Sequence, residues 1–213
     1  MTTQNMPVLA LRGLTAFPGQ TLSFDAEREI SILALENAME GDRELLLVTQ
    51  REIGVQEPQE EDLYAIGTVC RIFQIVKTSD TGVRVIAGGL HRAAIRRLWQ
   101  TKPFLQANVD LLEDEGWRAT DRTEALTRRI YALFGRYQEL VGNLLVASVL
   151  DIRDPGELAD TIAANINLRH QDRQRVLEEL HPVRRLMIMN EILLHEVDIA
   201  ALESDIDQKV RQR

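Results

Sequence analysis

Residues with catalytic or metal-binding potential are few in this chain, and none of them forms a complete motif. His195 is followed by Glu196, as at the start of a zinc-binding His-Glu-x-x-His helix, but Ile199 occupies the place of the second histidine. Cys70 is the only cysteine, which excludes an intramolecular disulfide and a zinc site built from cysteines. We expect an exposed helical histidine at position 195 and a buried structural thiol at Cys70.

Motifs for nucleotide binding and for a serine nucleophile are absent from the sequence. The strings Gly-x-x-x-x-Gly-Lys-Ser/Thr, Gly-x-Gly-x-x-Gly and Gly-x-Ser-x-Gly do not occur. The acidic segment 57–62 lacks the regular ligand spacing of a calcium loop and is typical of a polar loop. We therefore expect no catalytic residue, no cofactor site and no metal site in this chain.

The charge of the chain argues against a general nucleic-acid coat. The net charge is −8 and the sequence pI is about 5.1, whereas phosphate binding needs a clustered positive field. The basic run 91–97 favours a solvated strand face, and salt-dependent binding to RNA or DNA would support the nucleic-acid alternative.

No apolar run approaches the roughly 20 residues of a membrane span, and the first residues do not resemble a signal peptide. We expect a cytoplasmic protein with no membrane partner.

The first part of the chain, residues 1–116, has the composition and periodicity of strands. Paired glycines at 88–89 predict a bulge or a sharp bend of the kind that curls a sheet toward a barrel. One helix interrupts this part, with Asp25 as its expected N-cap and Gly41 as the residue that ends it. Apolar and β-branched runs predict strands at 44–49, 64–77, 83–99 and 104–112.

The second part, residues 117–213, changes to a helical period. Asp154, Pro155 and Glu157 form a helix start, and a long final helix is expected from Pro182. The sequence therefore predicts an α+β fold with two domains: a curled β-rich part with one helix over 1–116, and a helical bundle over 117–213. The end of the final helix carries an apolar stripe formed by Ile199, Leu202, Ile206 and Val210.

Several strings resemble the N-terminal domain of the Lon family, and they occur in the family's order. The opening segment 6–19 is similar to the family's P-V-L-P-L-R-G-x-x-x-F-P-G. Further resemblances cover nearly the whole chain and lie at 26–35, 45–50, 63–72, 89–92 and 154–160. Their joint occurrence is more specific than any one string.

The resemblance implies a β-rich subdomain similar to PUA-like barrels, followed by a helical subdomain. It implies a non-catalytic substrate-recognition and assembly module of an ATP-dependent serine protease. Full-length members form homo-oligomeric rings, usually hexamers, and serve protein quality control and the stress response by degrading misfolded, damaged and selected regulatory proteins. Their ATP, Mg and catalytic residues lie downstream of this region, and we expect unfolded or damaged polypeptides as partners.

Apolar residues near the first turn, Phe17, Pro18 and Leu22, are candidate substrate contacts, with ordinary core or turn packing as the alternative for each. The stripe from Ile199 to Val210 is a candidate assembly surface, because a lone stripe needs a partner helix.

The helical spacing continues to the end without a stop signal, which favours a fragment of a longer protein. The alternatives are a stand-alone Lon-like substrate-binding protein and a purely structural oligomerisation domain.

Overall fold

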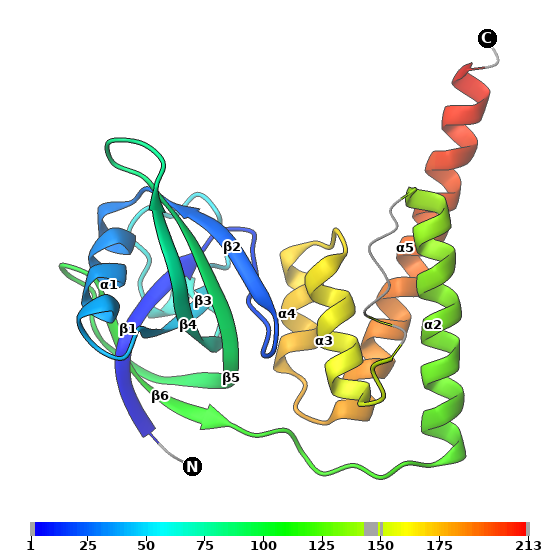
Figure 1. Cartoon of the computed structure of the whole chain (residues 1–213), viewed down its shortest axis with the longest axis horizontal. Coiled ribbons are helices and arrows are strands. Elements are labelled where there is room, and N and C mark those ends of the chain that lie inside the picture. Colours follow the sequence, from blue (N-terminus) through cyan, green and yellow to red (C-terminus); the bar gives the residue numbers. More distant parts are fainter. Residues whose placement is uncertain (1–2, 143–148, 150, 212–213) are drawn as a thin grey trace. The chain divides into compact units, whose positions relative to one another are not determined.

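The computed structural model describes residues 3–142, 149 and 151–211, which divide into two compact units (Figure 1). The first unit holds the described residues up to Glu113 together with Ile166–Glu178, and the second unit holds the rest. The division at Glu113 lies close to the sequence-based boundary at residue 116. The segment 166–178 differs from that scheme, because it belongs to the β-rich unit although helices of the second unit flank it in the sequence.

The first unit contains six strands and two α-helices. The helix α4 packs on β4, where the Gln174 side-chain amide donates to the Ile66 carbonyl at 2.9 Å. Arg92 Nε of β5 donates to the Leu177 carbonyl, also at 2.9 Å. The elements are β1 (Thr3–Leu11), β2 (Thr21–Ala26), α1 (Glu29–Glu40), β3 (Glu44–Thr49), the short 3-10 helix η1 (Glu60–Asp62), β4 (Ile66–Lys77), β5 (Val83–Gln100), β6 (Leu105–Leu112) and α4 (His170–Glu178).

The six strands form one mixed sheet that curls until β5 meets β6. The strand order is β2-β5-β4-β3-β1-β6, and an additional pairing joins β5 to β6. Only β1 and β3 run parallel among the described pairs, with Val8 opposite Leu46. The α+β class and the curled β-rich part with one inserted helix are confirmed.

The length and irregularity of β5 make the closure possible. Its first half pairs with β2, its second half pairs with β6, and both halves pair with β4. The register with β4 shifts beside Gly89, because Val69 lies opposite His91 while Cys70 lies opposite Gly89. The predicted irregularity at Gly88–Gly89 is confirmed, and bulges of this kind increase strand bending and twist.

Strand β1 is buried on both faces from Met6 to Leu11, which explains its continuous apolar run. Leu9 and Leu11 pack in a cluster that includes Leu35 and Ala38 of α1. The alternate residues of β1 pack in a second cluster with β3, β4 and β6. Strand β1 therefore contributes side chains both to the face of the sheet covered by α1 and to the interior of the curled sheet.

The predicted helix start at Asp25 is wrong. Asp25 lies in β2, and α1 begins at Glu29 with Arg28 at the N-cap. The reason is a cross-strand ion pair: Arg84 of β5 donates to the two carboxylate oxygens of Asp25 at 2.8 and 2.9 Å. This pairing supports the strand instead of capping the helix. Gly41 ends the helix as predicted.

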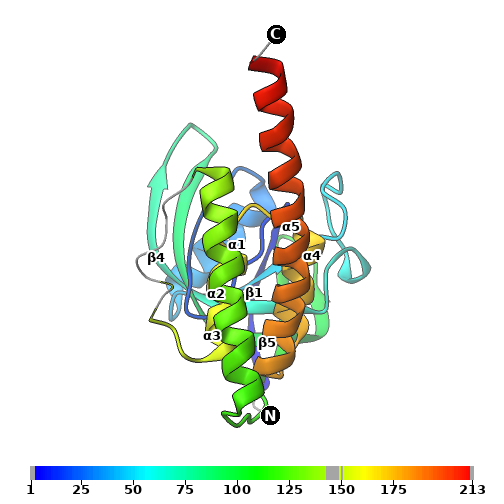
Figure 2. The same ribbon diagram turned by 90° about the vertical axis from the view of Figure 1, so that its right-hand side faces the viewer.

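The second unit consists of α2 (Asp121–Val141), α3 (Pro155–Asn165) and α5 (Pro182–Arg211). Figures 1 and 2 show α2 and α5 side by side and running in the same direction, and the Arg129 Nε donates to the Asn190 side chain at 2.9 Å between them. Asp154 caps α3, since its Oδ1 accepts from the Glu157 amide at 2.8 Å. The long final helix is confirmed, and it continues beyond the end of α2 (Figure 2).

A buried cation ties the second unit together. Arg185 of α5 is fully buried and faces two carboxylates, those of Asp114 and Asp160, at 2.5 and 3.3 Å. Its Nε also donates to the Glu179 carbonyl at 2.8 Å. Removing one member of such a buried network is costly, so this cluster fixes how the segment at 114 and α3 pack on α5.

Candidate functional site

The turn after β1 docks on the curled sheet at Gly89. Gly19 takes a φ of 72°, its amide donates to the Gly89 carbonyl at 3.0 Å, and the Gly89 amide donates to the Gln20 carbonyl at 2.9 Å. A Cβ on Gly89 would lie 2.0 Å from the Phe17 carbonyl oxygen. Only glycine permits this approach, so the paired glycines of β5 position the turn.

The three apolar residues of the turn region differ in exposure. Phe17 is a core side chain, 1% exposed, which is the alternative that the sequence left open. Leu22 is half-buried and packs against the cluster around Leu9 and Leu35, and Pro18 is half-buried. A substrate contact by Phe17, Pro18 or Leu22 stays a prediction, and the Phe17 ring is the least accessible of the three.

A groove lies beside the C-terminal half of β2, within the first unit. Its volume is about 480 Å³, and Leu9–Arg12 and Phe24–Arg28 line most of it. Arg12 Nη2 donates to Gln56 Oε1 at 2.8 Å. Arg28 Nη2 donates to the Ala10 carbonyl at 2.6 Å, and Arg28 Nη1 donates to Gln50 Oε1 at 2.7 Å.

The two arginines of the groove raise the local positive potential. Burial, together with the positive charge of Arg12, lowers the pKa of Arg28 to about 10. Both guanidinium groups donate to neutral oxygens, and neither forms an ion pair in the described part of the chain. The arrangement can therefore accept a carboxylate or another anion without displacing an existing counter-ion.

Sequence reasoning did not single out Arg12 and Arg28. Both lie in strings that carry the family resemblance, but the two positions are sixteen residues apart in sequence and meet only because β2 and α1 return beside β1. An arginine directly after an apolar strand, as at Arg12, is the one local signal that could have pointed to the groove.

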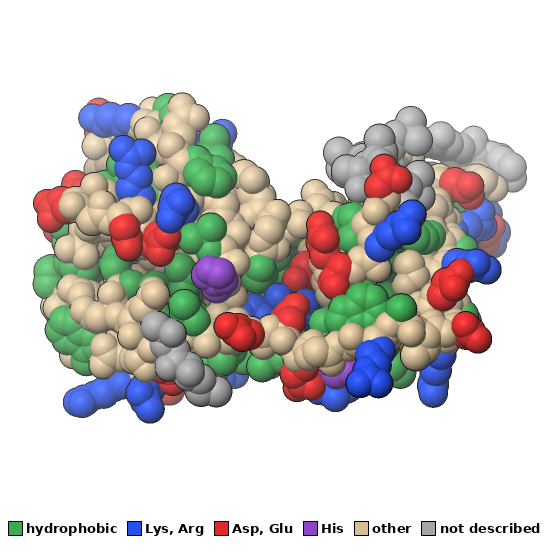
Figure 3. Space-filling model, turned by 60° about the horizontal axis from the view of Figure 1, so that its bottom comes forward, with side chains coloured by type: hydrophobic (Ala, Val, Ile, Leu, Met, Phe, Trp, Pro, Cys, Tyr) green, Lys and Arg blue, Asp and Glu red, His purple; other side chains and the backbone are tan. Residues whose placement is uncertain are grey.

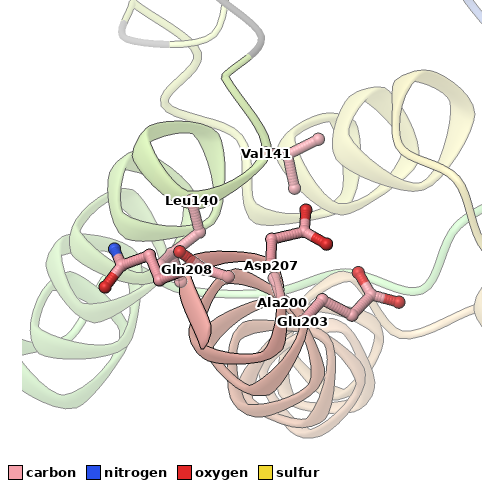
Figure 4. A pocket seen from close by; sticks show the side chains of 7 residues that line it. Leu140, Val141, Ala200, Glu203, Asp207 and Gln208 are labelled. Atoms are coloured by element: carbon pink, nitrogen blue, oxygen red, sulfur yellow. The ribbon is translucent and has the colours of Figure 1, made fainter. Parts of the chain in front are cut away.

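The apolar stripe of α5 is largely exposed. The exposed fractions are 65% at Leu202, 60% at Ile206 and 68% at Val210, and Ile199 is 36% exposed. A hollow of about 380 Å³ opens where the end of α2 meets this part of α5, and Figure 4 shows Leu140 and Val141 beside it together with Ala200 and acidic side chains of α5. The structure thus leaves the stripe available to another surface, and its role in assembly stays a prediction.

The residues that could take part in catalysis or metal binding lie on separate elements of the fold. Cys70 is buried, and burial raises the pKa of its thiol to about 12. His195 is an exposed residue of α5, and Asp62 of the acidic segment accepts from the Gln59 amide at 2.8 Å as a local cap. Within the described ranges, no group of three or more His, Cys, Asp or Glu side chains is arranged to hold a metal ion.

The basic run of β5 divides between the interior and the surface. Arg92 is buried, whereas Arg96 and Arg97 are exposed and Arg96 lies 3.7 Å from the Asp110 carboxylate. On the face drawn in Figure 3, hydrophobic side chains alternate with acidic and basic ones, and neither charge forms a continuous field there. Among the described helices, none is both long and apolar enough to cross a membrane.

Comparison with known proteins identifies the family. The model of the ATP-dependent protease La (LON) substrate-binding domain matches residues 5–195. The Lon protease of Brevibacillus choshinensis is 37% identical over 213 residues, which cover 99% of this chain and 27% of that protein. The Lon protease of Syntrophomonas wolfei is also 37% identical, with 100% and 26% covered. This chain thus spans about a quarter of the length of these relatives.

Solved structures agree with the fold. The N-terminal domain of the Mycobacterium avium complex Lon protease superposes with a TM-score of 0.70 at 21% identity, covering 92% of this chain and 98% of that one. The Lon N-terminal domain protein from Xanthomonas campestris gives a TM-score of 0.62 at 16% identity, with 86% and 95% covered. The resemblance seen in the sequence is confirmed. The chain belongs to the family of Lon substrate-binding domains and matches about a quarter of the length of Lon proteases.

Proposed function

We propose that this chain recognises substrates for an ATP-dependent Lon serine protease that degrades misfolded, damaged and selected regulatory proteins. The observation that carries the proposal is the match of residues 5–195 to a substrate-binding domain. Unfolded substrates expose apolar side chains and unpaired backbone, and a curled sheet with half-buried apolar residues and an open strand edge suits both features. Contacts of this kind are weak and tolerant of sequence, as a quality-control receptor requires.

The second element of the proposal is assembly. The exposed residues Leu202, Ile206 and Val210 lie at helical spacing on α5, and burying such a stripe against another helix is favourable. We assign it to contacts between neighbouring copies in a homohexamer of the full-length protein. Serine-protease chemistry, ATP and Mg belong to the rest of that protein, because this sequence has no phosphate-binding glycine loop. We place the complex in the cytoplasm, in the stress response.

The test compares the full-length protease with a version that lacks this chain. We expect ATP hydrolysis to continue while ATP-dependent degradation of an unfolded protein falls strongly, because delivery of the substrate is lost. The isolated chain should show only background ATP and peptide hydrolysis. Unchanged degradation without the chain would contradict the proposal.

Sedimentation of the full-length protein tests the assembly role of the exposed residues on α5. Leu202→Asp combined with Ile206→Asp should weaken assembly of the full-length protein, because the two carboxylates cannot be buried unpaired at an interface. The control is Glu203→Asp on the same helix, which preserves charge. An oligomerisation domain alone predicts self-association without affinity for unfolded protein.

A further inference from the structure

The first unit has a strand edge that no other described strand covers. β2 pairs with β5 alone. The Gly89 amide donates to the Gln20 carbonyl, and this bond sets the alternation of the ladder. The backbone groups that point away from β5 are therefore those of Thr21, Ser23 and Asp25. All three residues are exposed, and an exposed edge of this kind is a template for another strand.

The groove of about 480 Å³ lies between this strand and β1. On the other wall, the pairing of β1 with β6 ends at Val8 while β1 continues to Leu11, and the Ala10 carbonyl there accepts from Arg28 Nη2. Phe24, Ala26 and Leu11 give the groove an apolar floor. An extended polypeptide lying in it would face the outward backbone groups of Asp25 on the β2 side and apolar side chains below, and its continuation along β2 would meet those of Ser23 and Thr21.

Two cations at one end of the groove have no carboxylate partner among the described residues. Arg12 and Arg28 donate to carbonyl and side-chain amide oxygens, and the Arg12 Nε is buried without a hydrogen-bond partner in the described structure. Among the acidic residues lining the groove, Asp25 is engaged by Arg84, and Glu27 makes no ion pair with either groove arginine. A carboxylate from a ligand would complete this pair with charge-assisted hydrogen bonds.

A second hollow continues past the arginines. Its volume is about 400 Å³, it shares Arg28 and Gln56 with the groove, and its apolar lining comes from Ile30, Leu33 and Pro58 among others. The two hollows together offer, in sequence, a strand edge, a cationic pair and a pocket of mixed lining, in which Glu29, Glu57 and Lys102 accompany the apolar side chains. This order suits an extended chain whose acidic residue is followed or preceded by an apolar one.

We propose that the groove binds an extended acidic segment of an unfolded polypeptide, which adds as a strand to β2 and places a carboxylate side chain against Arg12 and Arg28. The proposal rests on the proposed function and names the substrate class that this surface selects. Backbone pairing gives the tolerance of sequence, and the arginine pair gives the preference for acidic segments.

The first test measures charge preference by fluorescence anisotropy. Two labelled Thr- and Val-rich peptides differ only in a central Glu or Gln and are titrated with the 213-residue chain. We expect the Glu peptide to bind about tenfold more tightly, because charge-assisted bonds replace neutral ones. Arg12→Gln with Arg28→Gln should remove the preference, and Arg122→Gln, an exposed arginine of α2, should keep it.

Arg28 also organises its own surroundings, so a second variant guards against misfolding. Arg12→Lys with Arg28→Lys keeps both charges and should retain part of the preference, which a merely structural role would not produce. Equal affinity for the two peptides in the unaltered chain would overturn the cationic half of the proposal.

The second test addresses strand addition directly. Amide hydrogen exchange of Thr21, Ser23 and Asp25 should slow at least severalfold when the Glu peptide is added, because these amides acquire partners. Ser23→Pro should weaken both peptides alike, and Ser23→Thr should not. Unchanged exchange at all three amides would overturn this half.

The two proposals fail in different ways. If an unfolded protein binds the unaltered chain and the doubly substituted Arg12→Gln, Arg28→Gln chain equally well, the groove assignment is wrong while substrate recognition stands. If no unfolded protein binds either chain, recognition itself is contradicted.

Discussion

The turn that follows β1 can dock on β5 because Gly89 has no Cβ atom. The Phe17 carbonyl oxygen would lie 2.0 Å from a Cβ at position 89, and backbone on both sides leaves little freedom to move. We expect Gly89→Ala to lower the free energy of unfolding by about 1–3 kcal/mol, as overpacking does. Urea denaturation measures the change.

Gly116→Ala is the matched control for this substitution. No atom lies within 4 Å of a Cβ placed on Gly116, so the free energy of unfolding should change by no more than about 0.5 kcal/mol. Equal effects of the two substitutions would show that the turn is not held by close approach at Gly89.

The buried thiol of Cys70 should make the free energy of unfolding depend on pH in alkaline solution. Burial raises its pKa from the ordinary value of 9.0 to about 12, so the thiol stays protonated in the folded chain where it ionises in the unfolded chain. Its stabilising contribution is complete below pH 9 and is lost as the pH rises from about 9 to about 12, by about 1.4 kcal/mol per pH unit.

Comparison with Cys70→Ala isolates this contribution from other groups that titrate in alkali. Unfolding free energies measured between pH 8 and pH 10 should fall more steeply for the unaltered chain than for the variant. Identical slopes would contradict the burial of Cys70. The buried thiol within a strand was predictable from the apolar run around it, since Cys in such a run behaves as a small hydrophobe.

At the scale of elements, strands and helices follow periodicity, while their ends depend on distant partners. The run 44–49 and the helix from Pro155 were predictable because local spacing and capping suffice. The helix near Asp25 begins later than predicted because Asp25 pairs with Arg84, 59 positions away. The proximity of Arg12 and Arg28 could not be predicted for the same reason, because it depends on β2 and α1 returning beside β1.

The exposed end of helix α5 should contribute little to the thermal stability of the chain. Ala200 is buried, but Leu202, Ile206 and Val210 are at least 60% exposed, so the last two turns contribute little packing within the described chain. Truncation after Asp205 should leave the thermal midpoint within about 2 °C of the full chain. Differential scanning calorimetry measures it.

Truncation after Leu193 is the control for α5, because it removes Ala200 and the part of the helix that packs beside α2. This shorter chain should lose several degrees in thermal midpoint. A similar loss in the chain that ends at Asp205 would show that the exposed stripe is needed for the stability of its own unit, and would weaken its assignment to assembly.

At the scale of the whole molecule, two compact units were foreseeable from the change of period, but the membership of α4 was not. The packing of α4 on β4 depends on Gln174 and on Arg92, whose contacts cross more than eighty positions of sequence. The groove likewise belongs to no single segment. The family match adds that the chain is a substrate-binding domain, because neither composition nor periodicity identifies a ligand.

Recognition of unfolded polypeptide by this chain is measured most directly with one test protein in two states. A disulfide-bonded protein is titrated with the chain in its native form and after reduction and carbamidomethylation, which keeps it unfolded at the same temperature and buffer without adding charge. We predict saturable binding of the unfolded form, weakened by excess acidic peptide, and no binding of the native form. Equal binding of the two forms, or binding of neither, would contradict the account.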